Sequence, residues 1–307
     1  MVADSSCVLT PGPWEHRNVA ANGAQFHVAL AGPPDRGQPL VVLLHAFPQF
    51  WWAWRHQIPV LADAGYRVAA MDLRGFAGSD KPPRRHETAV LARDVAGVVR
   101  SLGAAGAVVV GHGFGATVAW SMPALAPDLT RAVVALGNPH PVPLHRPGLA
   151  LPWGALGTMA AFQVPWFPER ALSEGDLVAR LLRRWSAPGN DGATSQAALY
   201  TEAMGLPFAA HSAMEHFRWL ARSTPRTDGR RYLAALAAPI RVPVLTIRGR
   251  QDPLMGARAF GRDAAYVRAP LRQEVLDGAG HFLPEEAPDA VGDLLLAFLA
   301  EHAPVRR

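Results

Sequence analysis

The sequence predicts an α/β fold with a mostly parallel, doubly wound sheet that is interrupted by a helical segment. Short apolar runs alternate with helical patterns from residue 39 to residue 136. This rhythm stops after Pro139 and resumes at residue 242. Strands that alternate with helices are typical of parallel sheets covered by helices on both faces. Three short loops, each directly after a predicted strand, carry the candidate catalytic residues.

The elements follow in order along the chain. Residues 18–31 predict a hairpin that turns at residues 21–23, because Asn-Gly is a strong hairpin signal. Residues 39–45 are an apolar run that suits a strand buried on both faces. Further strands are expected at residues 66–71, 107–110, 132–136, 242–248 and 272–276, and helices at residues 54–64, 88–102, from about 115, 177–185, 210–221 and 288–302.

The predicted organisation is one sheet domain in two parts with an inserted lid. We place the core at residues 1–140 and 239–307, and the helical lid at residues 141–238. The stretch from Gly148 to Phe167 is uncharged, but Pro152 and Pro165 interrupt it. Because proline breaks helices, we interpret this stretch as part of an apolar lid and expect no stable membrane insertion.

Composition argues against several function classes. The chain has 307 residues and a formal charge of +5, but its arginines are dispersed and Lys81 is its only lysine. Nucleic-acid binding needs a clustered basic surface, so no nucleic-acid partner is expected. Cys7 is the only cysteine, and residues 1–17 lack a secretory signal pattern. We therefore expect a cytoplasmic protein, and the absence of metal-ligand spacing and phosphate-binding loops predicts no cofactor.

The three loops carry a nucleophile position, an acid and a histidine in that order. The first loop holds Gly113 between Gly111 and Gly115, the small-residue frame of a sharp strand-to-helix turn. The second holds Asp252, and the third holds His281. Loops at the carboxyl ends of parallel strands converge, so Asp252 is expected to orient His281, and His281 to act as a base.

These motifs resemble the soluble epoxide hydrolases of the α/β-hydrolase superfamily, in particular the actinobacterial epoxide-hydrolase-like proteins. The resemblance is carried by residues 45–59, 72–82 and 278–281 and runs from about residue 13 to residue 302. It implies an oxyanion hole made by the backbone N–H groups of Phe47 and Phe114. It also implies that Trp51 lies beside the substrate. Thr158 and Phe217 match the positions of two lid tyrosines of the family, and Tyr200 or Tyr232 are alternatives for that role.

Gly113 is the main departure from the family, which has an aspartate nucleophile at this position. A glycine has no side chain to form an ester intermediate. Three explanations stay open: a turn that has relaxed to the residue best suited to positive φ, room for a water molecule activated by His281, or an engineered inactivation. The family's glycine at position 46 is replaced by Ala46, a smaller departure.

Two functions are therefore expected from the sequence. In the first, the protein hydrolyses a small apolar molecule, epoxide- or ester-like, with His281 activating water and without a covalent intermediate. In the second, it is an inactive pseudo-hydrolase that serves as a ligand-binding or protein-interaction module. A homodimer is the assembly that we consider.

Overall fold

The computed structural model of the chain describes residues 5–34, 37–145 and 153–305. Its centre is an eight-stranded sheet with the strand order β1-β2-β4-β3-β5-β6-β7-β8. Strand β2 runs antiparallel to both of its neighbours, and every other pairing is parallel. The predicted α/β fold with a mostly parallel sheet is thus confirmed. The strands are β1 (Glu15–Ala21), β2 (Ala24–Ala31), β3 (Leu40–Leu44), β4 (Arg67–Met71), β5 (Ala107–His112), β6 (Thr130–Leu136), β7 (Val244–Gly249) and β8 (Leu271–Leu276).

The central strands are the most apolar part of the sheet because helices cover them on both sides. Every residue of β3 and of β5 is buried. Strand β1 turns into β2 through Asn22 and Gly23, which both have positive φ (46° and 74°). Two such residues form the turn whose twist suits a tight hairpin. At the other edge, β8 has no fully buried residue.

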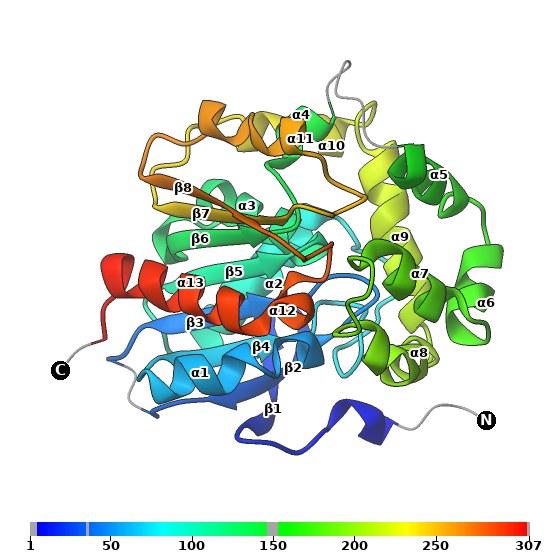
Figure 1. Cartoon of the computed structure of the whole chain (residues 1–307). Coiled ribbons are helices and arrows are strands. Elements are labelled where there is room, and N and C mark those ends of the chain that lie inside the picture. The colour runs from blue at the N-terminus through cyan, green and yellow to red at the C-terminus, as the bar shows by residue number, and fades with distance from the viewer. Residues whose placement is uncertain (1–4, 35–36, 146–152, 306–307) are drawn as a thin grey trace.

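Helices lie on both faces of the sheet, as expected for a doubly wound arrangement (Figure 1). On one face α1 (Gln57–Asp63) packs against α13 (Pro288–His302). On the other face α2 (Thr88–Ser101) packs against α3 (Phe114–Leu125), which follows β5 directly. The predicted helix at residues 54–64 is divided into the 3₁₀ helix η2 (Trp51–Trp54) and α1.

Between β6 and β7 the described residues, 141–145 and 153–236, are mostly helical, and we call this part the helical insertion. Helices α5 to α9 gather at one end of the sheet (Figure 1). The predicted helices at residues 177–185 and 210–221 correspond to α7 and α9. The insertion consists of α4 (Pro141–Leu144), α5 (Trp153–Ala161), α6 (Phe167–Ser173), α7 (Leu177–Trp185), η4 (Thr194–Gln196), α8 (Ala197–Met204), α9 (Ala209–Arg222) and α10 (Thr227–Leu236).

Short helices complete the chain: η1 (Ser5–Val8), η3 (Pro127–Leu129), α11 (Ala257–Phe260), η5 (Asp263–Ala265) and α12 (Leu283–Glu286). Part of the apolar stretch from residue 148 to residue 167, namely residues 148–152, lies outside the described residues. Among the helices that the structure describes, none is both long and apolar enough to cross a membrane.

Glu286 of α12 joins the helical insertion to the core. Its carboxylate accepts hydrogen bonds from the backbone N–H groups of Gly280 (2.8 Å) and Phe282 (2.7 Å), on either side of His281. It also accepts one from the N–H of Ala187, in the segment after α7 (2.7 Å). The same carboxylate therefore positions both the His281 loop and the insertion against each other.

Candidate active site

The turn between β5 and α3 places Gly113 at the carboxyl edge of the sheet. Gly113 has φ 53° and ψ −113°, a conformation that residues with a side chain rarely adopt. Its N–H donates to the carbonyl oxygen of Leu136 at the end of the neighbouring strand β6 (2.8 Å). Gly115 is required by close approach, because a Cβ atom there would lie 2.4 Å from the carbonyl oxygen of Leu44. The predicted sharp turn is therefore present, with Gly113 at its tip.

His281 and Asp252 form a hydrogen-bonded pair across two adjacent loops. His281 Nδ1 lies 2.9 Å from Asp252 Oδ2, and both side chains are buried. The other oxygen, Asp252 Oδ1, accepts from the N–H groups of Leu254 (2.7 Å) and Met255 (3.2 Å). A carboxylate only accepts hydrogen bonds, so the proton of a neutral His281 belongs on Nδ1. Its Nε2 is then left with a free lone pair, as a general base requires.

The base points at the tip of the turn. A Cβ atom added to Gly113 would lie 3.1 Å from His281 Nε2. The backbone N–H of His281 donates to the carbonyl oxygen of Trp185 (2.8 Å), which also holds the loop. The structure thus brings together three of the predicted site residues, Gly113, Asp252 and His281.

His112, next to Gly113 in sequence, supports the histidine loop from below. Its Nε2 lies 2.7 Å from the carbonyl oxygen of His281, an acceptor, so this nitrogen carries the proton. Burial lowers the pKa of His112 to about 3, which keeps the ring neutral. This arrangement gives His112 a structural role in holding the His281 loop.

The two backbone amides proposed for the oxyanion hole lie at the same site. Phe114 is the first residue of α3, and the first N–H groups of a helix have no acceptor within the helix. Phe47 lies in the loop after β3, and no acceptor for its N–H occurs among the described residues. Both residues line the cavity described next, so the residues predicted to form the oxyanion hole lie at the same site as Gly113 and His281.

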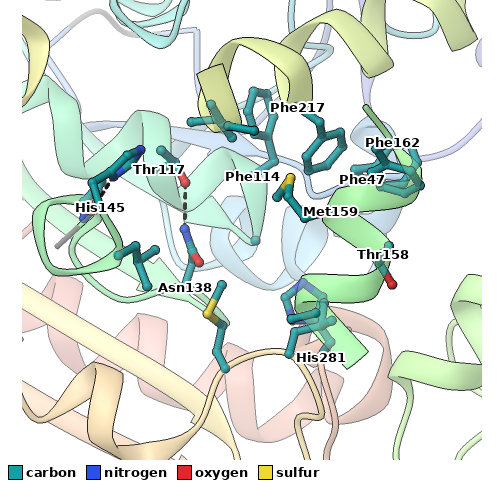
Figure 2. Close-up of a pocket in the computed structure, with 18 of the residues that line it drawn as sticks. Phe47, Phe114, Thr117, Asn138, His145, Thr158, Met159, Phe162, Phe217 and His281 are labelled. Atoms are coloured by element: carbon teal, nitrogen blue, oxygen red, sulfur yellow. Dashed lines mark hydrogen bonds between the residues drawn. The ribbon is translucent and has the colours of Figure 1, made fainter. Parts of the chain in front are cut away.

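A cavity of about 460 Å³ lies over Gly113 and His281, beneath the helical insertion (Figure 2). Its walls are largely apolar and come from both the core and the insertion. The lining residues are Phe47, Gly113, Phe114, Thr117, Asn138, Pro141, Leu144, His145, Ala155, Thr158, Met159, Phe162, Trp185, Phe217, Leu220, Ala221, Thr224, Leu254, Met255 and His281. Thr158 and Phe217, predicted to contact substrate, are among them.

Aromatic rings from the core and the insertion meet on one side of the cavity (Figure 2). The ring of Phe47 lies 5.5 Å from that of Phe162 and 5.0 Å from that of Phe217. The rings of Phe162 and Phe217 lie 5.1 Å apart, and Phe114 lies 5.9 Å from Phe217. We call these four residues the aromatic wall. Such a surface favours an apolar ligand, and rings at these spacings stabilise one another.

Several polar lining residues were not predicted from the sequence. Asn138 Nδ2 donates to Thr117 Oγ1 (2.6 Å), and this pair lies across the cavity from the aromatic wall (Figure 2). Asn138 lines the cavity, whereas His140, two residues further along the same loop, does not. Thr117, His145 and Thr224 carry no sequence signal, because a lone polar residue on a helix or loop is indistinguishable from a surface position.

The structure does not place Trp51 at the cavity. Its side chain is fully buried, its Nε1 donates to the carbonyl oxygen of Val8 (2.8 Å), and its ring packs edge-on against Trp14. The prediction that Trp51 contacts substrate is therefore corrected: it is a core residue that binds the N-terminal segment to the sheet domain.

No tyrosine lines the cavity, and all four tyrosines of the chain lie among the described residues. Tyr200 is buried, with its hydroxyl 2.9 Å from Glu285 Oε1. Tyr232 is buried, with its hydroxyl 2.9 Å from Ser121 Oγ. The alternative that Tyr200 or Tyr232 serves in place of the family's lid tyrosines is therefore wrong. Within the described residues, no group of three or more histidine, cysteine or acidic side chains is arranged to hold a metal ion.

Comparison with known proteins defines the class. The alpha/beta hydrolase fold family matches residues 39–288, which include the turn, the acid and the histidine. The chain therefore belongs to the alpha/beta hydrolase fold family.

Individual relatives narrow this placement. The chain is similar to Epoxide hydrolase A of Mycobacterium tuberculosis, with 34% identity over 92% of this chain and 96% of that protein. It is also similar to Epoxide hydrolase 4 of Homo sapiens, with 29% identity over 96% of this chain and 82% of that protein. The crystal structure of Epoxide Hydrolase A from Mycobacterium thermoresistibile matches with a TM-score of 0.79 and 28% identity, over 95% of this chain and 99% of that one. The predicted resemblance to epoxide hydrolases is confirmed.

Proposed function

We propose that this protein hydrolyses a small apolar, ester- or epoxide-like molecule by direct attack of water, with His281 as the general base. The observation that carries the proposal is the His281–Asp252 pair, buried at a mostly apolar cavity, with Nε2 directed at the tip of the turn. Catalytic residues are proposed to be His281 and the backbone amides of Phe47 and Phe114. Asp252 positions His281.

The reaction is best served by a carbonyl electrophile. Water donates a proton to His281 Nε2 while its oxygen bonds to the carbonyl carbon, and Asp252 stabilises the imidazolium that forms. The carbonyl oxygen becomes an oxyanion that accepts hydrogen bonds from the N–H groups of Phe47 and Phe114. When the intermediate collapses, the C–O bond to the alcohol breaks, and the leaving oxygen takes the proton from Nε2.

An epoxide is the less favoured electrophile. When water opens an epoxide, the former epoxide oxygen becomes an alkoxide, and this alkoxide needs a proton donor. No tyrosine lines the cavity to provide one. The imidazolium formed at His281 would have to reach the alkoxide on the side opposite to the attacking water. We therefore rank an ester-like substrate above an epoxide. We also propose that the protein is cytoplasmic and works without a cofactor.

The test compares turnover of short aryl esters and of styrene oxide by the unaltered protein, by His281→Ala and by a matched control. His56→Ala is suitable as the control because His56 is exposed and lies outside the cavity. We expect His281→Ala to lose at least about 100-fold in turnover and His56→Ala to lose none. In water labelled with ¹⁸O, with the protein in excess over ester, the label should enter the acid product in the first turnover and never enter the protein. Unchanged turnover in His281→Ala would reject the role of His281.

The second candidate is a pseudo-hydrolase that binds a small apolar ligand without converting it. It is favoured by the glycine at position 113 together with the absence of tyrosine from the cavity. This function predicts saturable binding of apolar probes, such as styrene oxide or short aryl esters, by both the unaltered protein and His281→Ala. It also predicts no turnover by either protein beyond that of the buffer.

A further inference from the structure

The space at the tip of the turn is limited by Ala46 as well as by the glycine at position 113. A Cβ atom added to Gly113 would lie 2.8 Å from the Cβ atom of Ala46 and 3.6 Å from its Cα atom. Carbon atoms in van der Waals contact lie about 3.5–4.0 Å apart. A side chain at position 113 therefore cannot begin without displacing Ala46, although glycine fits.

Ala46 is held so that it cannot easily move away. It is almost fully buried (1% exposed) in the loop after β3. Its carbonyl oxygen accepts from His45 Nδ1 (2.9 Å) and from the N–H of Gln49 (3.0 Å). His45 Nε2 in turn accepts from the N–H of Leu73 (3.1 Å). Displacing the methyl group would break these bonds or shift the loop that carries the Phe47 amide.

The opposite side of the same space is closed by the base. The added Cβ atom would lie 3.1 Å from His281 Nε2, and His281 is itself fixed through Asp252 and through its backbone N–H. Two independent contacts thus bound one small volume, a methyl group on one side and a ring nitrogen on the other. A residue with a Cβ atom at position 113 meets both contacts, whereas glycine meets neither.

We infer that Ala46 selects the nucleophile: its methyl group excludes any side chain from position 113, so that only a solvent-sized group can lie next to His281. Ala46 and Gly113 are then a matched pair, and exchange of one residue alone does not convert the site to a covalent one. The steric exclusion does not depend on the proposed function. Only the identification of the nucleophile as water rests on the proposed function. The inference also argues against a single engineered change at position 113, because Ala46 would conflict with the residue that such a change removed.

A thermal double-mutant cycle tests the exclusion without reference to activity. Gly113→Ala adds only the Cβ atom, and Ala46→Gly removes only the opposing methyl group. We expect Gly113→Ala to lower Tm by at least about 3 °C more when residue 46 is alanine than when it is glycine, because residues in contact are not additive. Equal losses in the two backgrounds would overturn the inference.

Backbone strain is separated from the clash by a control glycine. Gly23 also has positive φ (74°), but a Cβ atom there would meet no atom within 4 Å. Gly23→Ala measures the strain that positive φ alone causes, and this loss should be the same whether residue 46 is alanine or glycine. A dependence of the Gly23→Ala loss on residue 46 would show that the coupling at position 113 is not local, and would count against the inference.

A second measurement adds the carboxylate. Gly113→Asp and Ala46→Gly/Gly113→Asp are incubated with phenethyl bromide, because the carboxylate displaces bromide, which leaves as an anion without needing a proton donor. The reactions are quenched in acid and examined by mass spectrometry for an ester on residue 113. We expect the double variant to accumulate at least ten times more ester than Gly113→Asp alone. Equal ester in both variants would overturn the inference. If coupling is present in Tm but neither variant forms ester, the steric clash stands, but the inference that Ala46 selects the nucleophile is overturned, because a carboxylate admitted at position 113 does not then act as one.

Discussion

The carboxylate of Asp252 divides its two oxygens between a side chain and the backbone. One oxygen accepts from His281, and the other accepts from the N–H groups of Leu254 and Met255. The backbone bonds fix the carboxylate, and the carboxylate then fixes both the orientation and the tautomer of the histidine. The chemistry proposed for His281 therefore depends on a residue that does not itself line the cavity.

Asp252→Asn should separate orientation from proton chemistry. The amide oxygen can replace Oδ1 toward the backbone, which directs the amide NH₂ at His281 Nδ1. Nδ1 would then have to accept, the proton would move to Nε2, and the base would be lost. We expect turnover to fall about 10³–10⁴-fold with Tm within a few degrees of the unaltered protein, as the measured loss for the corresponding change in a Ser-His-Asp triad suggests. Turnover near that of the unaltered protein would show that Asp252 does not set the tautomer.

At the scale of elements, one short helix connects the histidine loop with the insertion. Glu286 ends α12, and its carboxylate accepts three backbone N–H groups, two beside His281 and one after α7. Burial raises the pKa of Glu286, and the three N–H donors oppose that effect. The element therefore couples the position of the base to the position of the insertion.

Glu286→Gln should loosen both partners at once. A glutamine has one acceptor oxygen, and its NH₂ group would face a backbone N–H, so at least one buried donor loses its acceptor. We expect a loss of about 1–3 kcal/mol in the free energy of unfolding and faster hydrogen exchange at residues 278–282 and 187. Glu301→Gln, an exposed change on α13, is the matched control and should alter neither. Stability equal to that of the control would remove Glu286 from this role.

The elements differ in how far the sequence predicts them. Strands β3 and β5 are short apolar runs, and three closely spaced glycines indicate the turn at Gly113. Local sequence patterns therefore suffice to predict the strands and the turn. Helices α5, α6, α8 and α10 were not anticipated individually. Each is short, and the amphipathic patterns of α5 and α8 are weak. The sequence around Trp51 does not distinguish a core residue from a cavity residue. The partner of its side chain, the carbonyl oxygen of Val8, is distant in sequence.

The same limit applies to the site. The order of Gly113, Asp252 and His281 along the chain predicts their convergence, because all three follow parallel strands. The contact between Ala46 and Gly113, and the aromatic wall, join segments that are distant in sequence, so only the folded structure reveals them.

At the scale of the whole molecule, two buried carboxyl groups contribute to the response of stability to pH. Asp263 is fully buried in η5, where Oδ1 accepts from the N–H of His140 (2.9 Å) and Oδ2 has no partner among the described residues. Burial raises its pKa from 3.8 to about 7. Burial also raises the pKa of Glu285 to about 7, despite its contacts with Arg55, Tyr200 and Gln49.

The contribution of these two carboxyl groups to stability is therefore expected to fall as pH rises from about 4 to 7, whereas the buried histidines, whose pKa values burial lowers, contribute in the opposite direction. An acid whose pKa is raised by folding holds its proton longer in the folded state, so its stabilising contribution is complete below pH 4 and is lost as pH passes through 7. Asp263→Asn keeps the acceptor for His140 and removes the charge. We expect this variant to exceed the unaltered protein at pH 8 by on the order of 2–4 kcal/mol in the free energy of unfolding, and to match it near pH 3.5. Denaturation at both values measures the difference, and Asp277→Asn, an exposed change, should produce none. A constant difference across this range would show that Asp263 does not titrate as described.

The aromatic wall has a consequence for the ligand selectivity of the cavity. Phe47 and Phe114 belong to the core and Phe162 and Phe217 to the insertion, so the two halves touch through their own rings. A ligand in the cavity would lie against these rings, and the apolar surface that both then remove from water would favour binding. Binding would therefore favour flat, apolar molecules before any chemical step. A charged or strongly hydrated molecule would be disfavoured because it would have to lose its hydration.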